Sequence, residues 1–172
     1  RQHYLKLTLE ANMKFMYHKL WGVDLRIFTG GFIAHTDRRF GQMPLLLIAG
    51  NRKDYHYDDH VLGRREFDNV LAQQVSLREG GFKTAIENIQ YAGASNTFIF
   101  AVNLKSDIPI KLPFRTKYVK LKPFLDIGYH VNADPTITIT NIGQEIMLSG
   151  GIMIDIWDGA GGIYLPLFGT DN

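Results

Sequence analysis

The sequence predicts an all-β protein, and more specifically an antiparallel transmembrane β-barrel. The first observation is the stretch of residues 3–17, where apolar side chains fill every second position and Lys6, Glu10 and Lys14 lie between them. Side chains alternate between two faces along a strand, so this stretch has one apolar and one charged face. Its length is about twice that of an ordinary strand and exceeds the roughly 9–11 residues that a transmembrane strand needs. The same pattern then recurs along the chain.

Two further strands are predicted in residues 23–34 and 97–108. In the first, Leu25 and Ile27 share one face and Arg26 lies on the other. The second stretch alternates in the same way, with its asparagine and its lysine on one face. The charges therefore keep to one side of each strand, which favours a membrane barrel over a soluble sandwich with shorter strands.

The last three predicted strands are residues 117–129, 144–157 and 162–168. The first two again segregate their charged side chains to one face, opposite a series rich in leucine and isoleucine. The third is interrupted by Pro166, which a strand tolerates best near a sheet edge or a strand end. Apolar positions along all these strands are expected to face lipid, among them Leu7, Leu9, Leu25, Val102, Leu121, Ile152 and Ile154.

Loop lengths predict the orientation of the barrel. Bacterial barrels have short periplasmic turns and longer outer loops. The connections His18–Gly22, Pro109–Thr116 and Asp158–Gly161 are short and are assigned to the periplasmic side, whereas His130–Gly143 is assigned to the outside.

Residues 35–95 form the longest connection. The strands on either side of it must run in opposite directions, so this segment makes either no further membrane pass or two. The candidate passes, Met43–Ala49 and Val70–Leu77, alternate poorly. We therefore predict a long extracellular excursion that lies wholly on the outer side, with two extra passes as the alternative.

The predicted strand number leaves the barrel incomplete. Single-chain bacterial barrels have at least eight strands, and the open edges of a smaller sheet would leave backbone groups that lipid cannot satisfy. We therefore expect the chain, which begins with Arg1 and shows no signal peptide, to be a fragment of a larger barrel or to pair with another outer-membrane chain.

Composition excludes several classes of function. The formal net charge of +2 is too small to indicate a nucleic-acid partner. The absence of cysteine rules out disulfide, zinc-thiolate and thiol chemistry within this chain. Aromatic residues make up 12% of the sequence, which suits the aromatic girdles of a membrane barrel and equally a large β core. The expected partner is the lipid bilayer, and the expected location is the outer membrane of a Gram-negative bacterium.

Several segments resemble those of a known family. Residues 54–67, Gly80–Lys83 and Val102–Pro109 look like segments of large outer-membrane proteins of the Bacteroidetes type, and Lys122–Gly128 and Ile163–Leu167 extend the resemblance. Those proteins carry a metallopeptidase domain of the aminopeptidase-N (gluzincin) kind, followed by a carboxy-terminal β-barrel. The resemblance covers most of this chain, but only the barrel part of the family.

The resemblance implies a membrane anchor for a peptidase-like domain, in a parent protein that is a zinc metallopeptidase. The zinc signature of the family, HExxH with a downstream glutamate, is absent here. No catalytic residue is carried over, and no cofactor is expected in this segment. Surface-antigen barrels of the outer-membrane assembly type are the closest rival family, and their Arg-Gly-Phe inner-loop motif is not seen.

Candidate sites outside the strands are few. His56 and His60 are four residues apart, which on a helix would place both imidazoles on one face for a metal. Their tyrosine and aspartate neighbours do not form an amphipathic helix, so we expect a solvated loop and no metal site. Arg64 and Arg65 could recognise an anion such as a lipopolysaccharide phosphate, although packing within the loop is the simpler interpretation. The apolar run 45–48 is expected to pack inside the long loop or over the barrel mouth rather than form an exposed partner surface.

The charged residues on the polar faces of the strands form a candidate barrel lumen. Six are basic and four acidic: Lys6, Glu10, Lys14, Asp24, Arg26, Lys105, Lys120, Lys122, Asp126 and Asp155. A pore would use such residues for ion selectivity. The mixed signs favour mutual neutralisation in a packed polar interior.

The sequence is therefore compatible with three functions. The first is a barrel that anchors a peptidase-like domain at the cell surface or the periplasmic face. The second is a transport or outer-membrane assembly barrel, porin-like or surface-antigen-like, in which the lumen does the work. The third is a soluble β-barrel or sandwich that binds a ligand.

Overall fold

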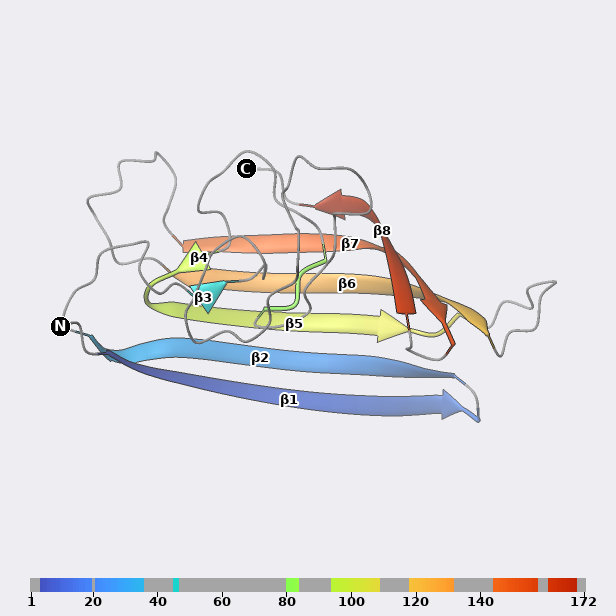
Figure 1. Cartoon of the computed structure of the whole chain (residues 1–172), viewed down its shortest axis with the longest axis horizontal. Coiled ribbons are helices and arrows are strands. Elements are labelled where there is room, and N and C mark those ends of the chain that lie inside the picture. The colour runs from blue at the N-terminus through green and yellow to red at the C-terminus, as the bar shows by residue number, and fades with distance from the viewer. Residues whose placement is uncertain are drawn as a thin grey trace.

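The computed structural model describes residues 4–19, 21–35, 45–46, 80–83, 94–108, 118–131, 144–157 and 161–169. Six strands form one antiparallel sheet in the order β1-β2-β5-β6-β7-β8 (Figure 1). The six strands are β1 (Tyr4–His18), β2 (Trp21–His35), β5 (Phe98–Ser106), β6 (Val119–Val131), β7 (Gln144–Ile156) and β8 (Gly161–Gly169). Two short strands, β3 (Leu45–Leu46) and β4 (Ala94–Ser95), pair separately. The described residues include no helix that is long and apolar enough to cross a membrane.

The all-β class and the six strands are as predicted, because each strand is marked by its own alternation. The sheet is not closed, and β1 and β8 form its two edges. Strands β2 and β5 pair directly, with Leu25 opposite Leu104. This pairing excludes the alternative in which two further strands from the long connection lie between them.

The two faces of the sheet differ in environment. Along β6, Phe124, Asp126, Gly128 and His130 are buried, whereas the residues between them are only half-buried. The same alternation holds for β5 and for much of β7. We call the buried side the covered face and the opposite side the open face. Side chains on the open face are mostly apolar, and Leu9 there is 68% exposed.

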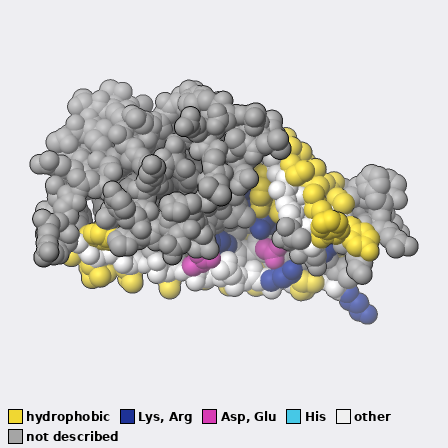
Figure 2. Space-filling view, viewed as in Figure 1, with side chains coloured by type: hydrophobic (Ala, Val, Ile, Leu, Met, Phe, Trp, Pro, Cys, Tyr) yellow, Lys and Arg dark blue, Asp and Glu magenta, His cyan; other side chains and the backbone are white. Residues whose placement is uncertain are grey.

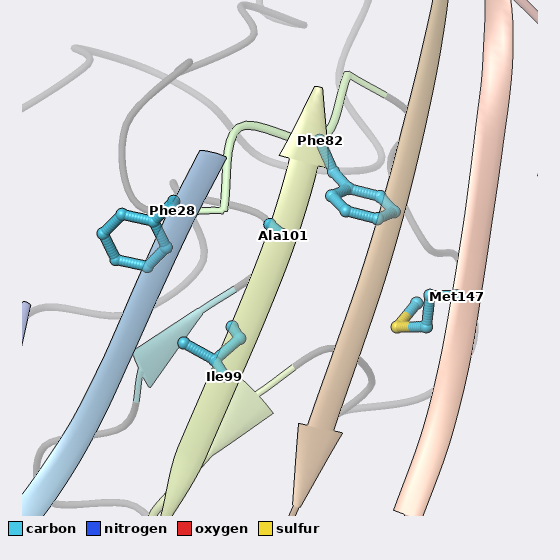
Figure 3. Packing of buried hydrophobic residues seen from close by; sticks show 5 residues of the cluster. All are labelled: Phe28, Phe82, Ile99, Ala101 and Met147. Atoms are coloured by element: carbon cyan, nitrogen blue, oxygen red, sulfur yellow. The ribbon is translucent and has the colours of Figure 1, made fainter. Parts of the chain in front are cut away.

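The covered face holds a small apolar core. Its buried members are Phe28, Phe82, Ile99, Ala101 and Met147 (Figure 3). Four come from β2, β5 and β7, and Phe82 comes from the long connection between β2 and β5. Polar and charged residues are buried on this face as well, including Asn103, Asp107, Asp126, Ser149 and Asp155. The described part of the interior is therefore unusually polar for a globular protein.

One described segment of the long connection between β2 and β5 lies against the sheet itself. Residues 80–83 lie on the covered face against the middle of β5 and β6, where Asn103 and Asp126 contact them. We call residues 80–83 the inserted segment, and the predicted placement of residues 35–95 on the outer side of a membrane stays a prediction. Of the two candidate passes, Met43–Ala49 contains β3, and Val70–Leu77 lies outside the described residues.

Candidate functional site

The register of the sheet aligns a row of polar residues across the covered face. Antiparallel pairing places Arg26 of β2 opposite Asn103 of β5, and Asn103 opposite Asp126 of β6. Asp126 in turn lies opposite Ser149 of β7. Directly opposed residues on one face of a sheet are within contact distance, so these polar groups meet although they are far apart in sequence.

Hydrogen bonds connect this row into one network. The Arg26 guanidinium donates through Nη1 to Asn103 Oδ1 at 2.9 Å and pairs through Nη2 with Glu10 Oε2 of β1 at 2.9 Å. Asn103 Nδ2 donates to Asp126 Oδ1 at 2.9 Å, and Ser149 Oγ donates to Asp126 Oδ2 at 3.3 Å. The network thus joins five strands, from β1 to β7, through side chains alone.

The inserted segment binds to the centre of this network. The Lys83 ammonium forms an ion pair with Asp126, and the backbone N–H of Lys83 donates to the same carboxylate. Asn103 Nδ2 donates to the carbonyl oxygen of Gly80 at 3.0 Å. The neighbouring Phe82 is only 2% exposed and belongs to the apolar core. The segment is therefore held by polar and apolar contacts at the same time.

The Lys83–Asp126 pair is almost completely removed from solvent, with side chains that are 2% and 0% exposed. Burial lowers the pKa of Lys83 below its ordinary value, and the Asp126 carboxylate opposes that shift. The Lys83 ammonium also lies 5.2 Å from the centroid of the Phe124 ring, a cation–π contact. A buried pair of this kind is stable only while both partners are present, since a single charge left in the interior is strongly unfavourable.

Gly81 allows the inserted segment to approach the sheet closely. Its φ of 72° lies in the left-handed region that favours glycine. A Cβ atom at this position would lie 2.7 Å from Arg26 Nη1 and 2.8 Å from Asn103 Oδ1. Both atoms belong to the network that holds the segment, so a larger residue at position 81 would push the segment away from its binding site.

A second ionic cluster lies where β2 begins and β5 ends. The Lys122 ammonium is 2.7 Å from Asp155 Oδ2 and 3.6 Å from Asp107 Oδ1. Asp107 also accepts a hydrogen bond from the backbone N–H of Gly22 at 2.9 Å, and its carbonyl oxygen accepts one from the Tyr17 hydroxyl. This cluster fixes the ends of the strands to one another and has the character of a structural support.

Comparison of the chain with known protein families, with characterised proteins and with solved structures finds no match. The chemistry of the covered face must therefore be judged from its own residues. In the part of the chain that the structure describes, no three histidine, aspartate or glutamate side chains are placed to hold a metal ion. The polar side chains described above bind one another, and they bind the inserted segment.

The structure brings many of the predicted lumen residues together. Among the predicted set, Arg26 pairs with Glu10, Lys14 lies 3.7 Å from Asp24, and Lys122 pairs with Asp155. The predicted neutralisation of mixed charges is confirmed for these pairs. Asp126 pairs instead with a residue outside the predicted set, Lys83. Of the loop candidates, Leu45 and Leu46 form β3, while His56, His60, Arg64 and Arg65 lie outside the described residues.

Four residues of the networks described above were not among the candidate sites. Asn103 and Ser149 lie on the polar faces of predicted strands, but uncharged side chains did not stand out there. Asp107 follows a strand end, where it looks like a turn residue. Lys83 follows a Gly-Gly pair and a phenylalanine, a sequence typical of a bend. The sequence feature that could have singled out Lys83 is the combination of two glycines, a phenylalanine and a lysine in that bend.

Proposed function

We propose that the sheet is part of the wall of a transmembrane β-barrel in the outer membrane of a Gram-negative bacterium, where it anchors a peptidase-like domain of the same protein. The observation that carries the proposal is the polarity of the two faces. The described charged residues of β2, β5, β6 and β7 keep largely to the covered face, whereas apolar residues dominate the open face. A protein in water has the opposite arrangement, and a barrel in lipid has this one.

The exposed apolar surface supports the placement in lipid. Hydrophobic side chains are visible along the β1 edge and near the beginning of β8 (Figure 2). Leu7, Ile146 and Leu167, from three different strands, are each at least 62% exposed. Exposed apolar surface on this scale is unfavourable in water, where large patches on soluble proteins mark interaction sites. Contact with acyl chains would remove that penalty.

The anchoring role follows from the resemblance of Lys122–Gly128 and the other segments to the barrel region of outer-membrane metallopeptidases. The barrel would contribute location rather than chemistry. Confining an enzyme to a membrane raises its effective concentration near other molecules of that surface. The described residues offer no metal cluster that would give this region a catalytic centre of its own.

Fluorescence quenching tests the membrane placement. The chain contains no cysteine, so a thiol introduced at Leu7 or at Thr8 can be labelled selectively. Both residues are exposed, and they lie on opposite faces of β1. In vesicles that contain brominated lipids, we expect strong quenching of a fluorophore at position 7 and weak quenching at position 8. Equal, weak quenching at both positions would place the open face in water and contradict the proposal.

Cell fractionation of the full-length protein tests the anchoring role. We expect zinc-dependent aminopeptidase activity to sediment with the outer membrane, and deletion of this barrel region to release that activity into the soluble fraction. The barrel region alone should not hydrolyse aminoacyl substrates. Turnover by the barrel region that is lost in His56→Ala or His60→Ala would contradict this assignment and identify a metal site in the long connection.

A transport or assembly barrel is the second candidate, because the inserted segment occupies the covered face. Surface-antigen barrels have an inner loop, and Gly80–Lys83 is a segment of a long loop bound to the covered face in this structure. In that case, release of the segment would open a passage. Ionic conductance in planar bilayers should then rise in the Lys83→Ala variant, whereas an anchoring barrel requires no such change.

A further inference from the structure

A pocket of about 300 Å³ lies between the inserted segment and strands β1, β2 and β5. Gly81 and Lys83 line it on one side, and residues of the three strands line it on the other. Its charged lining residues are Lys14, Asp24, Arg26, Lys83 and Lys105. Four of these five described residues are cations, so the described part of the pocket lining carries a positive charge.

The sheet register explains this excess of positive charge. Asp24 lies opposite Lys14 on one side and opposite Lys105 on the other. Asp24 is therefore the cross-strand neighbour of two lysines, and the structure shows an ion pair with only one of them in the described residues. The Lys14 ammonium is 3.7 Å from Asp24 Oδ1, and no ion pair or hydrogen bond of Lys105 is found within the described parts of the chain.

The other two cations among the described lining residues are each paired with a carboxylate that is not in the described lining. Arg26 pairs with Glu10, and Lys83 pairs with Asp126. After each of these carboxylates is assigned to its cation, one positive charge remains among the described lining residues, that of Lys105. Its repulsion is felt within the pocket, since both Lys105 and Arg26 contribute to lowering the pKa of Lys83, after the larger effect of burial.

We infer that this pocket binds a small oxyanion, a phosphate or a carboxylate, with Lys105 as its principal partner. An anion at this point would neutralise the unpaired ammonium and relieve the repulsion among the neighbouring cations. Charge-assisted hydrogen bonds from ammonium and guanidinium groups to oxyanions are among the strongest in proteins. A volume of about 300 Å³ lies at the lower end of the range for small-molecule sites.

The inference goes beyond the proposed function and does not depend on it. The pocket lies on the covered face, so the same groups line it whether the open face contacts lipid or water. The anion site can therefore be disproved without affecting the membrane placement, and the reverse also holds. Because one side of the pocket is the inserted segment, a bound anion would also add contacts between that segment and the strands.

Calorimetric titration of the full-length protein in a non-ionic detergent tests the site, with inorganic phosphate and acetate as probes and chloride at matched ionic strength as the reference. We expect saturable binding of at least one oxyanion. Lys105→Gln should weaken that binding about tenfold or more, the range for loss of one charge-assisted hydrogen bond. Lys105→Arg should retain it, because the positive charge is kept.

Lys6→Gln is the matched control. It removes the same charge from the strand face that carries Lys14, but Lys6 lies opposite Phe32 at the other end of β1 and does not line the pocket. We expect Lys6→Gln to bind as the wild type does. Equal heats from oxyanions and chloride, or equal affinity in Lys105→Gln and the wild type, would overturn the inference.

Discussion

Replacing Asp126 by alanine is expected to lower the free energy of unfolding by about 3–5 kcal/mol, the cost of leaving one member of a buried ion pair alone. Lys83 would lose its only described ion-pair partner in a site that is only 2% exposed, so either an unpaired charge is buried or the ammonium gives up its proton, and both are costly. Asn103, Ser149 and the Lys83 backbone N–H would lose an acceptor in the same change. Urea unfolding of the protein in detergent, followed by tryptophan fluorescence, measures the effect.

Two control variants distinguish the effect of breaking the buried ion pair from the effect of removing a charge at an exposed position. Lys14→Ala breaks an ion pair on the same face whose lysine is 58% exposed, and it should cost at most about 1 kcal/mol. The double variant Lys83→Met with Asp126→Leu removes both buried charges and should recover part of the lost stability. If Asp126→Ala cost no more than Lys14→Ala, the inserted segment would not be held by this pair.

Gly81→Ala tests the same segment without removing any charge. The new Cβ would collide with Arg26 and Asn103, and the backbone at this position is in the left-handed region. Limited proteolysis near Lys83 should therefore be faster than in the wild type. Gly161→Ala is the matched substitution, because nothing lies within 4 Å of a Cβ at that position.

The second large effect is expected from arginine on the open face. Leu9→Arg should destabilise the protein in a bilayer by about 2–4 kcal/mol, the range for a cation near the membrane midplane. Thr8→Arg should change stability by less than about 1 kcal/mol, since Thr8 faces the polar side and lies next to Glu10 on that side. Unfolding titrations of both variants in lipid vesicles give the comparison.

This pair of variants is informative because both positions are exposed in the structure. In a water-soluble protein, exposed substitutions of this kind rarely change stability by more than about 0.5 kcal/mol in either direction. Only a lipid environment distinguishes the two faces of β1. Equal effects of Leu9→Arg and Thr8→Arg would therefore argue against the membrane placement, independently of the quenching experiment.

The strands could be predicted because their signal is local. Each strand carries its own alternation, and residues 3–17 and 144–157 were predicted to within one residue of β1 and β7. The separation of charged and apolar faces follows from the same period of two. Pairing of opposite charges across neighbouring strands, as between Arg26 and Glu10, follows once the strands are in register.

The position of the inserted segment could not be predicted because its contacts are not local. Lys83 meets Asp126 across 43 residues, and nothing in the sequence joins a Gly-Gly bend to an aspartate in the middle of a later strand. Alternation alone also treats Thr8 and Ser149 as equivalent polar positions. The structure separates them, because Ser149 is 2% exposed and donates to Asp126, while Thr8 is exposed.

The pairing of Lys83 with Asp126 also bears on how the chain folds. Most neighbouring strands are joined by short connections and can form as hairpins, whereas β2 and β5 must close a loop of residues 36–97. The entropy lost on closing a loop grows with its length, and distant contacts slow folding. Contact of the inserted segment with β6 divides this loop in two and leaves only residues 84–97 between Lys83 and β5. The inserted segment would thus be an intermediate point of attachment during assembly of the sheet. This attachment can form only after β6 is present, so pairing of β2 with β5 would follow the folding of β6.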